Sequence, residues 1–264
     1  MASLYDITKG EDVELYRILS QAGADAELAR AIIKRPELAA TMIGAVREQL
    51  APPLFSTPQE VLGRFAFYAG NRGWPLTNFL NPLKEQMPTD YVSSLNKVLT
   101  LDVWLGNLSI TFEALAGWIE YEQRQAGNGY WRYDGLKSDG KHLRLLDPER
   151  YGIEPSVRWV EVDMLANWDK ANALRPRDVR DPKTSAGLEI MTAYAVHPAY
   201  PPAIDYETIP GAWLPGLQVT LPGDEAWTHV PLLGWYGADR EVRLNAYRDG
   251  SRYWDYALPV RREL

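Results

Sequence analysis

The segment 241–250, EVRLNAYRDG, alternates two kinds of side chain and limits the possible folds more than any other stretch of the chain. Successive side chains of a strand point to opposite faces, so alternate residues share one environment. The aliphatic set comprises Val242, Leu244 and Ala246. The polar and aromatic set comprises Arg243, Asn245 and Tyr247. The alternation predicts a strand whose first set is buried and whose second set is exposed.

The exposed set belongs to a longer run of the same chemistry, which extends through the C-terminal tail. Aromatic rings give a large contact area at low entropy cost, and short polar groups adapt their hydrogen bonds, so this mixture favours a binding surface. A twisted sheet with tyrosines on its open face explains the same composition equally well. The residues that we assign to a ligand-binding surface are Tyr236, Asp239, Arg243, Asn245, Tyr247, Asp249, Ser251, Tyr253, Asp255 and Tyr256.

Composition excludes several classes of function. The hydrophobic content of 46% is enough for a real core, and the net charge of −7 disfavours partners such as nucleic acid or anionic membrane. The chain has no cysteine, which removes disulfides, thiolate metal sites and cysteine nucleophiles. Neither a signal sequence nor an apolar stretch of roughly 20 residues is present, so we expect no membrane insertion and a cytoplasmic location by default.

The first half of the chain reads as helical. Apolar residues recur at helical spacing within 11–50, and Thr57, Pro58 and Glu60 form a capping box with proline at the first helical position. The strongly apolar segment 98–118 is expected to end in a helix that continues to Arg124.

The second half has a different pattern. Residues 157–164 alternate, which predicts a half-buried strand with Val160 and Val162 inside and Glu161 on the solvated face. Residues 185–197 read as one helix, ended by Pro198. Short strand-like runs, separated by turn residues, follow from Ala212 onward.

A Gly-rich polar stretch at 126–141 separates these halves and suggests a domain boundary. The prediction is an α+β chain with a helical scaffold domain over 1–126 and a ligand-binding domain over 127–264. Two tryptophans in apolar helical context, Trp104 and Trp118, are expected in the core. Three others flanked by turn residues are expected to pin loops onto a small sheet: Trp213, Trp227 and Trp235.

Recognisable catalytic chemistry is absent from the sequence. His142, His197 and His229 are far apart, and the zinc, phosphate-loop, dinucleotide and serine-hydrolase motifs are missing, so we expect no metal and no cofactor. His197 lies at a helix end, where an imidazole helps to satisfy terminal carbonyls. The pair Glu161 and Asp163 could act as an acid–base couple, but a solvated strand face explains it more simply.

The tail also carries a resemblance, in WTHVPLL, REVRLNAY and the closing ALPVRREL. These motifs resemble the C-terminal variable region of target proteins that are diversified by diversity-generating retroelements. The resemblance covers about residues 150–264. It implies a C-type-lectin-like fold with a small antiparallel sheet, which displays variable residues on its ligand face.

The codons that such retroelements diversify limit which residues can vary. Changing the two adenines of AAC never yields Trp, Lys, Glu, Gln or Met. Between Leu232 and Ala257 only Trp235, Glu241 and Trp254 fall in that excluded set, so the resemblance implies that these three are framework residues.

The sequence therefore predicts a non-enzymatic, diversifiable binding protein. Its ligand is expected to be a protein or other macromolecule, because a small metabolite prefers a concave pocket. Two alternatives remain open. One is a hydrolase that uses Glu161 or Asp163 in a cleft between the halves, and the other is an assembly protein whose aromatic tail is a subunit interface in an oligomer.

Overall fold

The computed structural model describes residues 54–264, except 75, 76 and 225, as an α+β fold with mixed sheets. The expected fold class is confirmed at this level, and the helices expected within 11–50 lie outside the described residues. The helices are α4 (Pro58–Asn71), α5 (Thr77–Glu85), α6 (Leu108–Gln125), α7 (Pro176–Val179) and α8 (Leu188–Val196), with a short 3-10 turn at Pro201–Ala203. The strands are β1 (Val98–Trp104), β2 (Gly129–Arg132), β3 (Leu143–Leu145), β4 (Ser156–Asp163), β5 (Gly211–Trp213), β6 (Leu217–Val219), β7 (His229–Tyr236), β8 (Glu241–Arg248), β9 (Tyr256–Ala257) and β10 (Val260–Glu263).

Helix α4 begins at the predicted capping box. Thr57 Oγ1 accepts a hydrogen bond from the Glu60 N–H at 3.3 Å, and the Glu60 carboxylate accepts one from the Thr57 N–H at 2.7 Å. Pro58 occupies the first helical turn, where its missing N–H leaves no hydrogen bond unmade. The capping box and the helix are both confirmed.

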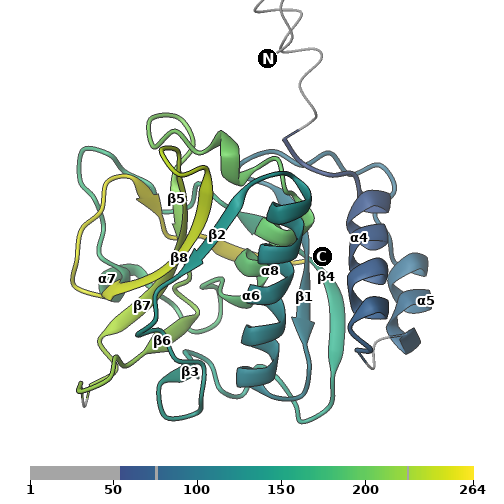
Figure 1. Ribbon diagram of the computed structural model, residues 1–264, viewed down its shortest axis with the longest axis horizontal. Coiled ribbons are helices and arrows are strands. Elements are labelled where there is room, and N and C mark those ends of the chain that lie inside the picture. Colours follow the sequence, from purple (N-terminus) through teal and green to yellow (C-terminus); the bar gives the residue numbers. More distant parts are fainter. Residues whose placement is uncertain (1–53, 75–76, 225) are drawn as a thin grey trace, which may run out of the picture. The chain divides into compact units, whose positions relative to one another are not determined.

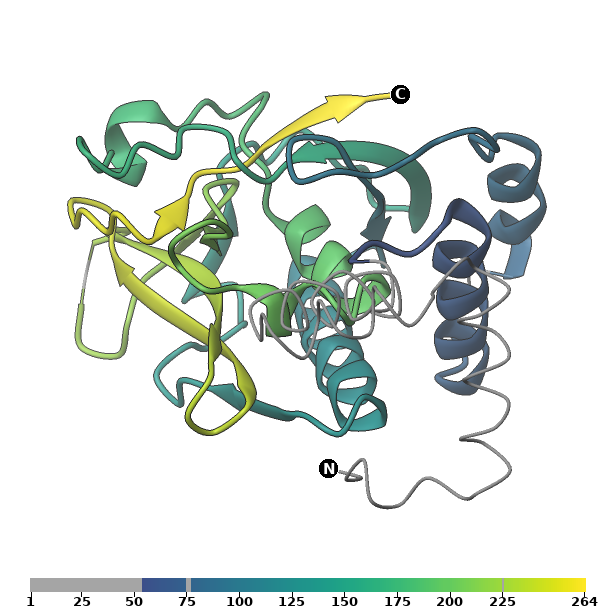
Figure 2. The same ribbon diagram turned by 90° about the horizontal axis from the view of Figure 1, so that it is seen from above.

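The strands form two sheets on either side of a buried helix. The first sheet is antiparallel, in the order β1-β4-β10, and the second has the path β2-β8-β7-β5-β9, with β3 and β6 attached to β7. The second sheet is not purely antiparallel, because β2 pairs with β8 and β5 pairs with β9 in parallel. Helix α8 is buried along its whole length and lies between the two sheets in Figures 1 and 2. Apart from Glu189 and Thr192 its residues are apolar or aromatic, which is typical of a helix in such a central position.

Strand β4 differs from its prediction on one face. Val160 and Val162 are buried as expected, but Trp159 and Glu161 are buried as well, with 5% and 6% of their surface exposed. Strand β4 is the middle strand of the first sheet, and α5 covers its second face, where the Trp159 indole donates to the Leu83 carbonyl at 2.7 Å. The predicted solvated face is therefore wrong.

Strand β1 was hidden inside the apolar segment 98–118. All seven of its residues are buried, so it shows no alternation. The chain turns at Gly106, which has a φ of 80° that favours glycine, and Asn107 then caps α6. The predicted helix through Arg124 is confirmed, and it is α6.

The expected domain boundary near residues 126–141 is wrong. Strand β1 pairs along its full length with β4, and one hydrophobic core takes residues from α4 through β8. The compact unit that contains all the described residues begins at Pro53. The polar stretch 126–141 is instead the connection that includes β2. Trp104 and Trp118 both belong to this core, as predicted.

His197 follows α8 and does not satisfy the carbonyls at the helix end. Its Nε2–H donates to the Leu99 carbonyl on β1 at 2.8 Å, and its Nδ1 accepts from the Ser56 N–H at 2.9 Å. The ring is buried, with 1% exposed, and the hydrogen bond that Nδ1 accepts requires its neutral form. Burial lowers the pKa of His197 from 6.5 to about 4.

We predict that this histidine makes the protein less stable in mild acid. In the unfolded chain His197 binds a proton as the pH falls below about 6.5, whereas in the folded chain it binds one only near pH 4. The free energy of unfolding therefore decreases as the pH falls from 6.5 to 4. Over this pH range the pKa shift of His197 lowers the free energy of unfolding by about 3 kcal/mol. Urea titrations between pH 7 and pH 4 should show a shallower decline for His197→Gln than for the parent chain. The partly exposed His142 provides the control, and an equal change in slope for His142→Gln would contradict the assignment.

Candidate ligand-binding face

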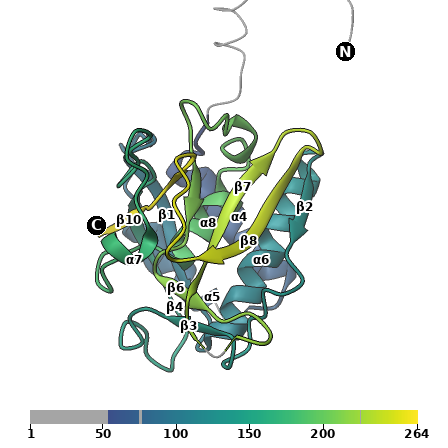
Figure 3. The same cartoon turned by 90° about the vertical axis from the view of Figure 1, so that its left-hand side faces the viewer.

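Strand β8 carries the predicted alternation and displays one row of side chains on the open side of the second sheet, which faces the viewer in Figure 3. Val242, Leu244 and Ala246 are buried, as predicted. Tyr247 is 40% exposed. Arg243 and Asn245 are less exposed than predicted and are half-buried, because they lie against neighbouring side chains. The predicted register is correct.

Arg243 is the centre of a cluster of polar and aromatic contacts on this face. Its Nε donates to Glu241 Oε1 at 2.6 Å, and its Nη2 donates to Asp239 Oδ2 at 2.8 Å. The guanidinium carbon lies 3.6 Å from the centre of the Tyr236 ring, a cation–π contact. The structure thus brings together three of the predicted site residues, namely Tyr236, Asp239 and Arg243.

Trp131 completes this cluster and was missed in the sequence. It pairs with Arg243 across the parallel β2–β8 ladder, and its ring centre lies 5.6 Å from the Arg243 guanidinium carbon. Its exposed fraction is 38%, and the Tyr133 ring lies 6.4 Å away on the same strand face. Alternation within GYWRY could have revealed β2, because Trp131 and Tyr133 share one side there. Interpreting 126–141 as a domain boundary concealed that signal.

At the C-terminal end of the predicted site, Tyr253 and Tyr256 pack against buried side chains and were expected to be exposed. The rings of Tyr253 and Tyr256 pack against a small cluster of buried side chains on the same sheet face, namely Trp213, Val230, Leu232 and Leu258. Tyr256 lies over two glycines: a Cβ added at Gly211 would come within 2.4 Å of its ring, and one at Gly234 within 2.6 Å of its hydroxyl. Tyr256 is therefore a packing residue, which period-two reasoning could not detect.

Asp249 is also structural. Its carboxylate pairs with Arg180 at 3.1 Å with only 13% of the side chain exposed, and its backbone carbonyl accepts from the Arg177 N–H on α7. The half-buried Asp255 has a raised pKa because burial disfavours its charge. Tyr247 and Tyr253 remain neighbours, with ring centres 5.1 Å apart, and Ser251 is half-buried beside them in the sequence.

The tryptophans expected to pin loops onto the sheet lie on or beside it. Trp213 on β5 and Trp235 on β7 are both buried, and Trp227 stacks against the Arg144 guanidinium at 4.5 Å. Tyr206 donates to the Trp235 carbonyl at 2.8 Å and so holds a connecting loop against β7.

The carboxylate pair considered for acid–base chemistry is already engaged. Glu161 Oε2 accepts from the Tyr91 hydroxyl at 2.6 Å, and its other oxygen lies 3.2 Å from Arg262 Nη1. Asp163 shares the same arginine at 3.5 Å. These contacts indicate an ion-pair network on the first sheet, and they do not favour the hydrolase alternative.

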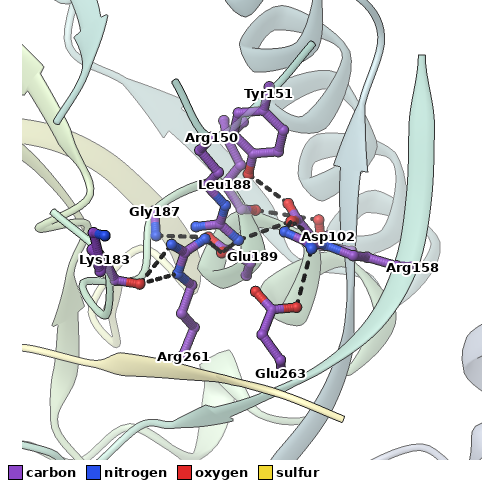
Figure 4. Close-up of polar contacts among 11 residues, drawn as sticks. Asp102, Arg150, Tyr151, Arg158, Lys183, Gly187, Leu188, Glu189, Arg261 and Glu263 are labelled. Atoms are coloured by element: carbon purple, nitrogen blue, oxygen red, sulfur yellow. Dashed lines mark hydrogen bonds and ion pairs between the residues drawn. The ribbon is translucent and has the colours of Figure 1, made fainter. Parts of the chain in front are cut away.

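A second group of charges is buried where α8 meets the first sheet and the C-terminal strand (Figure 4). Arg150 pairs with Asp102 at 2.8 Å and also with Glu189, while Arg261 lies 3.7 Å from Glu189. Asp102 accepts further hydrogen bonds from Tyr151 at 2.6 Å and from Arg158 at 2.9 Å, as the dashed lines in Figure 4 show.

Burial raises the pKa of the Glu189 carboxyl, and the Arg150 guanidinium opposes that rise. The neighbouring pocket, which Arg150 and Tyr151 line, measures about 10 Å³, which is room for about one water. A substrate cannot enter a space of that size. The network therefore joins α8, β1 and β10.

The described part of the chain contains no group of three or more His, Asp or Glu residues that could hold a metal ion. Among the helices within residues 54–264 that the structure describes, none is long and apolar enough to cross a membrane. Comparisons of the chain with protein-family models, with curated proteins and with solved structures found no match.

Proposed function

We propose that the chain is a non-enzymatic binding protein whose second sheet presents a diversifiable aromatic and polar face to a macromolecular ligand. The observation that carries this proposal is the cluster of Tyr236, Arg243 and Trp131 on a buried aliphatic framework. Aromatic and arginine side chains dominate the binding energy of most interfaces, and here they are already held in position before binding. An open sheet face suits a macromolecule better than a small metabolite.

The fold proposed for this function is C-type-lectin-like and comprises the whole unit 53–264. Support comes from helix α8, which is packed between two sheets, and from the tail, whose alternate residues face outward on the second sheet. The unit cannot begin at 127, because β1 supplies an edge strand of the first sheet.

Diversification by a retroelement is part of the proposal. Of the residues that AAC-derived codons cannot encode, Trp235 is buried and Glu241 holds Arg243, so both suit a fixed framework. Trp254 is 47% exposed, and its ring contacts the ammonium of Lys170 at 5.9 Å, so its side chain does not support a framework role. The encoding DNA tests the idea directly: a nearby near-copy of the tail's codons, differing at adenines, should accompany a reverse-transcriptase gene.

The binding function is tested by simultaneous replacement of the outward positions. We predict that a library varied together at Tyr236, Asp239, Arg243, Asn245, Tyr247 and Ser251 gives soluble, cooperatively melting proteins. Selection of that library against purified, unrelated proteins should yield binders, because the framework residues carry the stability and the varied residues carry the contacts.

The control is an equally large library at exposed positions away from this face: Gln59, Glu85, Asp90, Asn96, Gln125 and Lys141. Equal yields of binders from both libraries, or misfolding of most tail variants, would contradict the proposal. The assembly alternative predicts instead that the parent chain is an oligomer and that the tail variants lose it, which the mass in solution measures.

A further inference from the structure

A second aromatic cluster lies outside the Arg243 cluster and shares no side chain with it. Trp168 follows β4, Trp254 precedes β9, and the ammonium of Lys170 lies 5.4 Å and 5.9 Å from their ring centres. The same ammonium pairs with Glu207 Oε2 at 2.8 Å. One alkylammonium group thus contacts two indoles and a carboxylate at the surface.

The Trp168 ring and the backbone of Trp254 are held without help from the lysine. The Trp168 indole donates to the Trp254 carbonyl at 2.8 Å, which fixes one ring against the backbone that carries the other. The two segments are also joined by the Leu258 N–H to the Ala166 carbonyl at 3.1 Å and by the Asn167 amide to the Leu258 carbonyl at 3.2 Å. The backbone of Glu207 also lies in a hydrogen-bonded turn, since its N–H donates to Asp205 Oδ1 at 2.9 Å.

The lysine, in contrast, is weakly held. Its side chain is 38% exposed and that of Glu207 is 71% exposed, and an ion pair between such groups contributes at most about 1 kcal/mol. Ordering a lysine side chain costs up to about 2 kcal/mol of rotamer entropy. Lys170 is therefore an occupant that can leave, while the walls of the site remain.

We propose that Trp168, Trp254 and Glu207 form a binding site for an alkylammonium group of a partner protein, namely a lysine or methylated lysine side chain, and that Lys170 occupies this site when no partner is bound. Two indole faces attract the cation through their quadrupoles, and the carboxylate supplies the opposite charge. A partner's ammonium would replace Lys170 one for one, so the tethered lysine competes with the ligand. This inference does not rest on the proposed function of the Arg243 cluster.

The experiment titrates protein that carries ¹⁵N-labelled tryptophan with Nα-acetyl-trimethyl-lysine amide at constant ionic strength. The indole N–H resonances report binding, and Trp254→Phe assigns the exposed ring. We expect Trp168 and Trp254 to shift in the parent chain. In Lys170→Met the dissociation constant should be about fivefold lower, because the ligand no longer displaces an internal cation held by weak exposed contacts.

Lys97→Met is the matched control. It removes the same charge from another exposed lysine that lies over an aromatic ring, 4.8 Å from the centre of Tyr91, and it should leave the dissociation constant unchanged. Trp254→Ala should abolish the shifts at Trp168, and the neutral analogue acetyl-norleucine amide should cause none in the parent chain. Equal affinity in Lys170→Met and the parent, or equal shifts with the neutral analogue, would overturn the proposal. Unchanged thermal melting of each variant confirms that the comparison concerns folded protein.

Discussion

Replacing Arg150 with methionine is expected to lower the free energy of unfolding by about 3–5 kcal/mol, because it leaves buried carboxylates without their main counter-charge. Asp102 and Glu189 are 1% and 0% exposed, and Arg150 is the residue that pairs with both. Methionine keeps much of the side-chain volume, so the loss measures electrostatics more than a cavity. Urea unfolding at pH 7, followed by circular dichroism, gives the value.

The matched control is Arg158→Met in the same network. Arg158 also donates to Asp102, at 2.9 Å, but its side chain is 44% exposed, and Arg150 and Tyr151 still satisfy the carboxylate when it is removed. Its loss should therefore cost about 1 kcal/mol or less. Equal losses for the two variants would show that the buried position of Arg150 is unimportant. Glu189→Gln in the Arg150→Met background should recover part of the loss, since it removes one of the stranded charges.

Local signals in the sequence were sufficient where the structure depends on neighbouring residues. The capping box at Thr57 and the alternation around Leu244 are both local, and both are confirmed. The network at Arg150 could not be predicted, because its members come from β1, α8, β10 and the segment before β4 and meet only after long-range pairing.

The sequence-based predictions were wrong for strands that are buried on both faces, because we expected one buried and one exposed face. Strand β1 is buried on both faces, so its residues lack the alternation that identifies a strand. Glu161 faces what should have been solvent, but the Tyr91 hydroxyl and α5 cover that side of β4. The candidate site was affected similarly, since Trp131 contacts Arg243 from a strand that lies in the stretch interpreted as a domain boundary.

The second large effect concerns the stability of β8, whose alternate residues are buried and exposed. Leu244→Ala is expected to lower the free energy of unfolding by about 2–5 kcal/mol, because it deletes a fully buried side chain and leaves a cavity that the surrounding core can only partly fill. Leu244 is 0% exposed and pairs with Leu233 on β7, in the middle of the longest strand pair of the second sheet.

Tyr247→Ala, three residues further along the same strand, is the matched control. Its ring is 40% exposed and contacts the partly buried Tyr253, so the loss should stay below about 1 kcal/mol, as surface changes usually do. The slope of the urea transition should be the same for both variants, because neither alters the surface exposed on unfolding very much. A larger loss for Tyr247→Ala than for Leu244→Ala would mean that the strand register is reversed, and the residues assigned to the binding face would then be those of the core.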